Sequence, residues 1–185
     1  MDPSREETPW DWHAWTPKVS GDELRALEFA HGLGGEAPVV FDALAENARQ
    51  TEAVVYLAYW APDGKVRGTA VVELYQAPPG RPTANARRLT RASRRAPIED
   101  GQPPLGYSVM SGSSPYGHTV FQSLILPLGD ELLYRWVLTS FLNTGGLQLR
   151  FTFELPAREG AEEIEAFEDE FVELAHSIEA SYDNA

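Results

Sequence analysis

The most regular pattern of hydrophobic positions lies near the C-terminus of the chain. Between residues 161 and 181, apolar side chains recur at steps of three and four, while acidic pairs such as Glu162 and Glu163 occupy the positions between them. An α-helix has 3.6 residues per turn, so this spacing puts the apolar residues on one face. We therefore predict a long C-terminal helix packed through Ile164, Phe167, Phe171, Leu174, Ile178 and Tyr182.

A second pattern, in which apolar and polar residues alternate, predicts β-strands. It is clearest over residues 147–155, where Leu147, Leu149, Phe151, Phe153 and Leu155 share one face. Similar or fully apolar runs, bounded by turn residues, predict further strands at 53–60, 66–76, 105–111, 118–126 and 131–141. The first two of these flank Pro62-Asp63-Gly64-Lys65, which is typical of a turn, and are expected to form an antiparallel hairpin.

Two helices are predicted ahead of the strands, over about residues 20–32 and 38–50. Together these elements predict an α+β fold: an antiparallel sheet of about six strands packed with N-terminal helices and a long C-terminal helix. A chain of 185 residues is long enough for one such domain. We expect it to cover residues 19–185, with a Trp-rich tail at 1–18 and a basic Pro/Arg-rich loop at 77–104.

The tail contains three of the five tryptophans, Trp10, Trp12 and Trp15, within the stretch PWDWHAW. Thr8 followed by a proline predicts one helical turn here, with Trp12 and Trp15 on one side. Tryptophan is enriched in the energetic centres of protein interfaces, so the stretch is a candidate docking element. It could pack on its own domain, covering a sheet edge or an open face, or it could bind a partner.

The charge of the chain is unevenly distributed. Its net charge is −13, which disfavours binding to nucleic-acid phosphates. Residues 81–95 nevertheless hold six of the fifteen basic side chains and no acidic one. If this segment is helical, Arg87, Arg91 and Arg95 recur at steps of four, flanked by Arg88 and Arg94. They are candidate partner-binding residues, although the segment could also be a solvated loop or lie over acidic residues of its own domain.

The sequence contains no recognisable catalytic or metal-binding signature. Phosphate-loop, dinucleotide-binding and zinc-protease motifs are absent, and no pair of the four histidines has a metal-ligand spacing. The lack of cysteine excludes disulfides and thiolate chemistry. Because these signatures are absent, we expect no catalytic residue, metal or cofactor. No apolar run is long enough to cross a membrane, and the start lacks a secretory pattern, so we expect a cytoplasmic protein. Arginine-rich, lysine-poor composition is typical of a GC-rich bacterial genome.

The order of the predicted elements resembles the PsbP-like fold, a family with photosystem and nuclear-transport accessory proteins and LpqN-like bacterial proteins. The resemblance is carried by AVVYLAYWAPDGKVRGTAVVELY, by TVFQSLILPLGDELLYRWVLTSF with LQLRFTFELP, and by the closing FVELAHSIEASY. It covers about residues 38–182 and implies a non-catalytic accessory role in which the sheet is a scaffold for protein contacts. An SRPBCC-like helix-grip arrangement contains the same elements and remains open.

The sequence thus predicts a partner-binding or accessory protein of the chaperone, adaptor or immunity type, whose partner is another protein with an acidic or apolar docking surface. The alternative is a small-molecule-binding domain or enzyme, with a cavity between sheet and helices lined by Tyr56, Tyr59, Trp60, Tyr75, Tyr107 and Trp136. A subunit of a larger assembly, recognisable by a large apolar patch, is a third possibility. The partner and the oligomeric state stay open.

Overall fold

The computed structural model describes residues 11–15, 21–51, 53–60, 65–95, 97, 103–129, 131–144, 146–156 and 161–183. These residues form four helices and seven strands. The chain divides into two compact units, Met1–Val72 and Glu73–Ala185, and strand β3 (Val66–Gln76) contributes residues to both. None of the described helices has the length and apolar composition needed to cross a membrane. That residues 19–185 fold as one domain stays a prediction.

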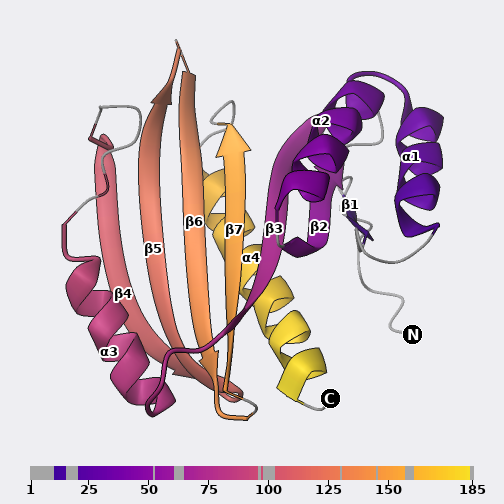
Figure 1. The fold of residues 1–185 in the computed structure, drawn as a ribbon. Coiled ribbons are helices and arrows are strands. Elements are labelled where there is room, and N and C mark those ends of the chain that lie inside the picture. Colours follow the sequence, from indigo (N-terminus) through magenta and orange to yellow (C-terminus); the bar gives the residue numbers. More distant parts are fainter. Residues whose placement is uncertain are drawn as a thin grey trace, which may run out of the picture. The chain divides into compact units, whose positions relative to one another are not determined.

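The first unit combines two helices with strands β1 (Asp11–Trp15), β2 (Ala53–Trp60) and the beginning of β3, in the order β1-β2-β3. Helices α1 (Asp22–Leu33) and α2 (Ala37–Gln50) lie beside each other (Figure 1). Their core is rich in alanine, with Phe41 and Tyr56 as its large buried members. Small side chains allow close approach of the helices, and Arg49 of α2 forms an ion pair with Glu23 of α1 at 2.5 Å.

The predicted helical turn in the tryptophan-rich stretch is wrong, because residues 11–15 form strand β1. β1 pairs antiparallel with β2, placing Trp12 opposite Tyr59 and Trp15 opposite Tyr56. Aromatic residues favour strands, and a sheet edge offers more backbone hydrogen bonds than a single isolated helical turn. Trp10 lies outside the described residues, as do the side chains of Trp12 and Trp15.

The second unit is a twisted antiparallel sheet in the order β3-β7-β6-β5-β4 with one helix on each face (Figure 1). Its strands β4 (Gly106–Ser114), β5 (Gly117–Leu128), β6 (Glu131–Leu142) and β7 (Leu147–Pro156) are joined consecutively, each antiparallel to the next. Beyond the end of β3, Ala77 donates its backbone N–H to the carbonyl of Gly146 at 2.8 Å. The predicted α+β class with its antiparallel sheet is confirmed, and β1 is an additional strand.

The register of β6 decides which helix covers which face of this sheet. Phe141 of β6 packs with Ala86 of helix α3 (Pro82–Ala92). Trp136, five positions earlier, stacks on Phe153 of β7, and Phe153 stacks on Phe171 of helix α4 (Ala161–Asp183), each at 5.3 Å between ring centroids. Odd and even positions of a strand point to opposite faces, so α3 and α4 cover opposite sides of the sheet. Figure 1 shows α4 passing behind β7.

The buried line of α4 runs through Phe167, Phe171, Ala175 and Glu179, four residues apart. The other predicted packing residues, Ile164, Leu174, Ile178 and Tyr182, are half-buried beside this line. The prediction of a packed C-terminal helix is therefore confirmed, with its most buried line shifted towards Ala175 and Glu179. The fully buried carboxyl group of Glu179 was not predicted.

Candidate functional site

Helix α3 forms part of the basic segment 77–104, which was predicted to be a loop. Arg81 precedes it with an extended backbone, and Pro82 stands at the first helical position, where its fixed φ angle and missing N–H cost nothing. Alanine, arginine and leucine, which favour helices, fill the turns that follow. The loop prediction is wrong because the apolar side of α3 is narrow: Ala86 and Leu89 are its members in the hydrophobic cluster that includes Val120 and Phe141.

Both ends of α3 are fastened to the sheet by side-chain hydrogen bonds. At the N-terminal end, Thr83 Oγ1 and His118 Nε2 of β5 lie 2.8 Å apart. At the C-terminal end, the hydroxyl of Tyr107 in β4 donates to the carbonyl of Ser93 at 2.5 Å, and Gln122 of β5 donates to that same hydroxyl at 3.1 Å. A helix held at both ends keeps its outward side chains in a defined position.

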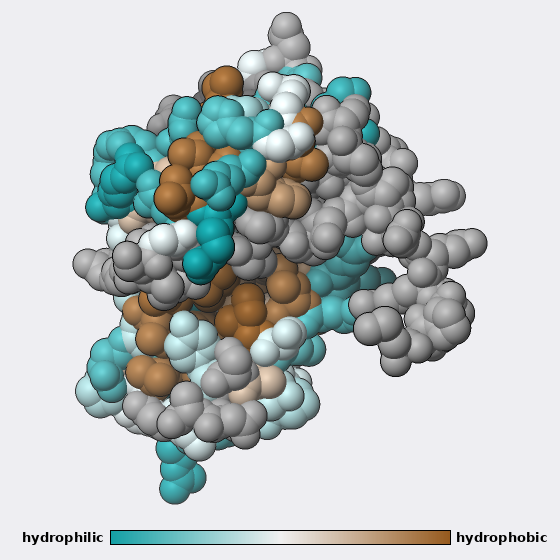
Figure 2. Space-filling view, turned by 90° about the vertical axis from the view of Figure 1, so that its right-hand side faces the viewer, coloured by the Kyte–Doolittle hydropathy of each residue, from teal (hydrophilic) through white to brown (hydrophobic). Residues whose placement is uncertain are grey.

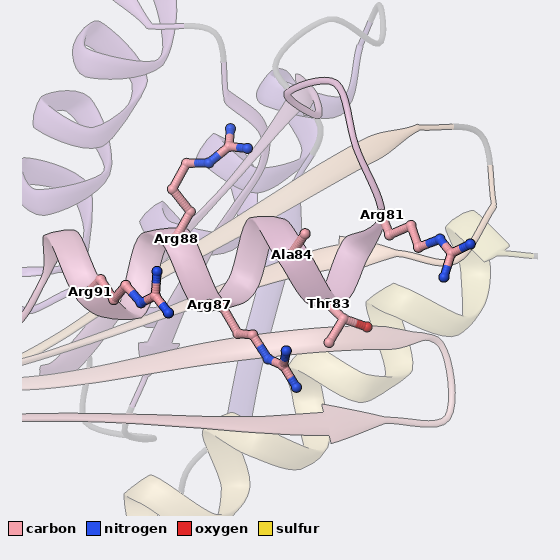
Figure 3. A pocket seen from close by; sticks show the side chains of 6 residues that line it. All are labelled: Arg81, Thr83, Ala84, Arg87, Arg88 and Arg91. Carbon is pink, nitrogen blue, oxygen red and sulfur yellow. The ribbon is translucent and has the colours of Figure 1, made fainter.

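The outward side of α3 and the turn after it carry six exposed arginines: Arg81, Arg87, Arg88, Arg91, Arg94 and Arg95. We call these six residues the arginine surface. Figure 3 shows Arg87 and Thr83 pointing from one side of α3 towards the hairpin of β4 and β5, and Arg88 pointing the opposite way. The guanidinium groups therefore spread over the helix, which suits an extended anionic partner better than a single small anion.

The arginine surface forms no ion pair with any residue in the part of the chain that the structure describes. Arginines elsewhere do: Arg49 pairs with Glu46 at 3.0 Å, and Arg135 pairs with Glu154 at 2.6 Å. The alternative in which the basic segment neutralises acidic residues of its own domain thus has no supporting ion pair among the described residues.

A shallow pocket of about 570 Å³ follows the arginine surface. It is lined by Arg81, Thr83, Ala84, Arg87, Arg88 and Arg91. Of the predicted partner-binding arginines, the structure brings Arg87, Arg88 and Arg91 together in this pocket, whereas Arg94 and Arg95 follow the end of the helix. The sequence prediction missed Arg81 and Thr83, although the Arg81-Pro82 pair carried the signal of a helix start.

A second pocket of about 500 Å³ lies beside the N-terminal end of α3 and includes Pro78, Gly80, Phe141 and Asn143 in its lining. Asn85, which is 2% exposed, also lines it. The Asn85 side chain donates to the carbonyl of Pro78 at 2.7 Å, while its own oxygen has no hydrogen-bond partner among the described residues. This pocket is mostly apolar and lacks the positive charge of the first.

The predicted aromatic-lined cavity stays a prediction, although two of its proposed lining residues, Tyr107 and Trp136, lie on opposite faces of the sheet. Tyr56 is fully buried, and its hydroxyl is hydrogen-bonded to Thr51 at 2.8 Å. Tyr107 lies in register with Leu124 and Arg135, which places it on the face opposite Trp136. The side chains of Tyr59 and Trp60 lie outside the described residues. A small-molecule site elsewhere stays a prediction.

Exposed apolar residues occur in both units. In the first unit, Leu24, Phe29 and Val39 are 59%, 39% and 73% exposed. Figure 2 views the molecule from the side where α1 lies in Figure 1, and hydrophobic residues reach the surface there among hydrophilic ones. Partner docking through Trp12 and Trp15 stays a prediction, and so does membership of a larger assembly.

Metal-ligating side chains do not gather within the described ranges, where no group of three or more His, Asp or Glu residues could hold an ion. No family model matches this chain, and no curated protein matches it either.

Proposed function

We propose that this protein is a non-catalytic accessory protein that binds an acidic segment of another protein through the arginine surface. The observation that carries the proposal is the set of six exposed arginines, none ion-paired within the described residues, on a helix fastened at both ends. The resemblance of the element order to PsbP-like accessory proteins favours the same role. We also propose that the protein acts in the cytoplasm.

Arginine suits this task because its planar guanidinium matches a carboxylate with two parallel hydrogen bonds. A protein segment is favoured over nucleic acid because a chain of net charge −13 repels a long polyanion. Residues 81–95 also contain no aromatic side chain on which a base could stack. A short acidic segment, in contrast, carries few negative charges, so the net charge of the chain repels it less.

The test uses a fluorescein-labelled peptide rich in glutamate, with binding followed by fluorescence anisotropy. Substituting Arg87→Gln, Arg88→Gln and Arg91→Gln together removes three exposed ion pairs worth about 0.5 kcal/mol each, so affinity should fall about tenfold. Raising the salt from about 0.05 M to about 0.5 M should weaken wild-type binding as well, since the Debye length shortens.

The matched control carries Arg25→Gln, Arg49→Gln and Arg150→Gln, which make the same change in net charge at arginines that do not belong to the arginine surface. It should bind the peptide within about twofold of the wild type, as expected for long-range effects that salt screens. Equal losses in both triple variants would show that net charge, and not the arginine surface, governs binding. Tighter binding of duplex DNA or anionic vesicles than of the peptide would overturn the choice of a protein partner.

A further inference from the structure

Strand β4 ends the strand order of its sheet, with β5 on one side and no strand on the other among the described residues. Its sequence, GYSVMSGSS, contains no charged residue and no proline. Natural edge strands are usually protected by lysine, proline, bulges, short length or a covering helix or loop, because their unpaired N–H and C=O groups would pair with another chain. β4 has nine residues paired in unbroken register with β5, so its own sequence and length provide none of the first four protections.

The side chains of β4 leave this edge open. Ser108, Met110, Ser111, Gly112 and Ser113 are all exposed, and Met110 is 58% exposed. In an antiparallel pair, alternate residues direct their backbone N–H and C=O groups away from the neighbouring strand. Small or uncharged side chains do not obstruct a strand that approaches these groups.

Helix α3 packs on one face of the sheet, over β5 and β6 as well as β4. Thr83, near the start of α3, bonds His118, which lies in register with Ser113 near the end of β4. Ser93, just after α3, accepts the hydrogen bond from Tyr107 near the start of β4. The arginine surface therefore lies on the side of the sheet that α3 covers, which includes β4, and Figure 3 shows Arg87 pointing towards the β4–β5 hairpin.

We propose that the edge of β4 binds an extended acidic segment of the partner as an added strand. This inference rests on the proposed function and adds its binding mode. Residues i and i+2 of a strand are about 6.7 Å apart, and residues four apart on a helix are separated by about 6 Å along its axis. Acidic side chains at alternate positions of the added strand thus match the spacing of Arg87 and Arg91. Backbone hydrogen bonds to β4 supply affinity, and the alternating charges supply specificity.

A second copy of this chain fits the same edge less well. Pairing β4 with its equivalent through a two-fold axis perpendicular to the sheet would put both α3 helices on the same face. Two arginine surfaces would then lie on the same side of one continuous sheet, and like charges brought together oppose association. The favoured occupant is therefore an acidic strand from another protein.

The test compares three peptides of about ten residues that alternate glutamate with valine, a length matched to β4. One is unmodified, one is N-methylated at the glutamates, and one at the valines. Only one set of alternate amides can bond to β4, so one methylated peptide should bind about tenfold more weakly, while the other matches the unmodified peptide. Hydrogen exchange of amides in residues 106–114 should slow when the unmodified peptide binds.

The possible failures are distinct. If both methylated peptides bind as well as the unmodified one, and exchange in β4 is unchanged, strand addition is refuted while the proposed function stands. If peptides with consecutive glutamates bind and the alternating peptides do not, the alternating pattern is refuted, and the proposed function again stands. If no acidic peptide depends on Arg87 and Arg91, the proposed function fails. A dimer whose formation protects the β4 amides would assign the edge to a second copy and overturn the proposal.

Discussion

Replacing Glu179 together with its hydrogen-bond partner should stabilise the protein. Glu179 and Ser140 are both fully buried, on α4 and β6. The Ser140 hydroxyl donates to one carboxylate oxygen of Glu179, and the other oxygen has no hydrogen-bond partner among the described residues. A buried polar atom without a partner costs about 1–3 kcal/mol, so removal of both polar groups should relieve that cost.

The magnitudes for the single and double variants follow from the same two contributions. Ser140→Ala leaves the whole carboxyl group without a partner and should destabilise by about 1–3 kcal/mol, the cost of leaving a buried polar group without a hydrogen bond. Glu179→Met keeps an unbranched side chain and removes the partnerless carboxylate oxygen, which should stabilise the protein. It also leaves the hydroxyl of Ser140 without a hydrogen-bond partner, which should destabilise it by a similar amount, so the net change in stability should be small. The double variant should be about 1–3 kcal/mol more stable than the wild type.

Urea unfolding followed by far-UV circular dichroism gives the free energy of unfolding of all four proteins. These free energies can be compared directly if the four proteins have the same m-value. The double variant isolates the coupling between the two residues. A double variant that is less stable than Glu179→Met alone would refute the reasoning, because the second oxygen of Glu179 would then have to make a favourable interaction.

Three further changes test the local structure. Tyr107→Phe removes the hydroxyl that fastens the end of α3; it should cost about 1 kcal/mol and speed hydrogen exchange in the last turn of α3, and unchanged exchange would contradict that role. Gly117→Ala places a Cβ atom too close to the backbone carbonyl oxygen of Phe141 in β6, so it should lower stability by about 3 kcal/mol in thermal unfolding. Gly112→Ala is the control that should be tolerated, because the nearest atom to its new Cβ atom is 3.5 Å away. Hydrogen bonds from Gln50 and then Arg49 hold the pKa of Glu46 below its ordinary value, so its contribution to stability is present above the ordinary pKa and is lost as the pH falls through the lowered one. Gln50→Ala should raise the pKa of Glu46 towards the ordinary value in an NMR titration, and an unchanged titration would assign the shift to the arginine alone.

Elements with long apolar periodicity were predictable from the sequence. The strand at 147–155 is confirmed with its alternation, since Leu149, Phe151, Phe153 and Leu155 are buried. The C-terminal helix is confirmed for the same reason. In both cases the apolar face is wide, so its period outweighs the intrinsic preferences of single residues.

Elements with a narrow apolar face, or with one that depends on distant partners, were not predictable. α3 reads as part of a loop because the segment 77–104 that contains it is rich in proline, glycine and arginine. β1 reads as a helical turn because local spacing cannot show that the edge of β2 will accept it. The buried position of Glu179 follows the four-residue line of Phe171 and Ala175, but a glutamate there reads as part of the solvated face. For the arginine surface, the cluster of positive charges could be predicted from the sequence. The hydrogen bond by which Tyr107 anchors α3 could not, because it depends on how the chain folds.

Strand β3 has a practical consequence for anyone who wishes to divide this protein. The boundary between the two compact units falls inside it, between Val72 and Glu73. A gene fragment that starts at the boundary would begin in mid-strand, and one that stops there would truncate the same strand. Dissection of the chain should therefore carry residues 66–76 intact into whichever piece is expressed.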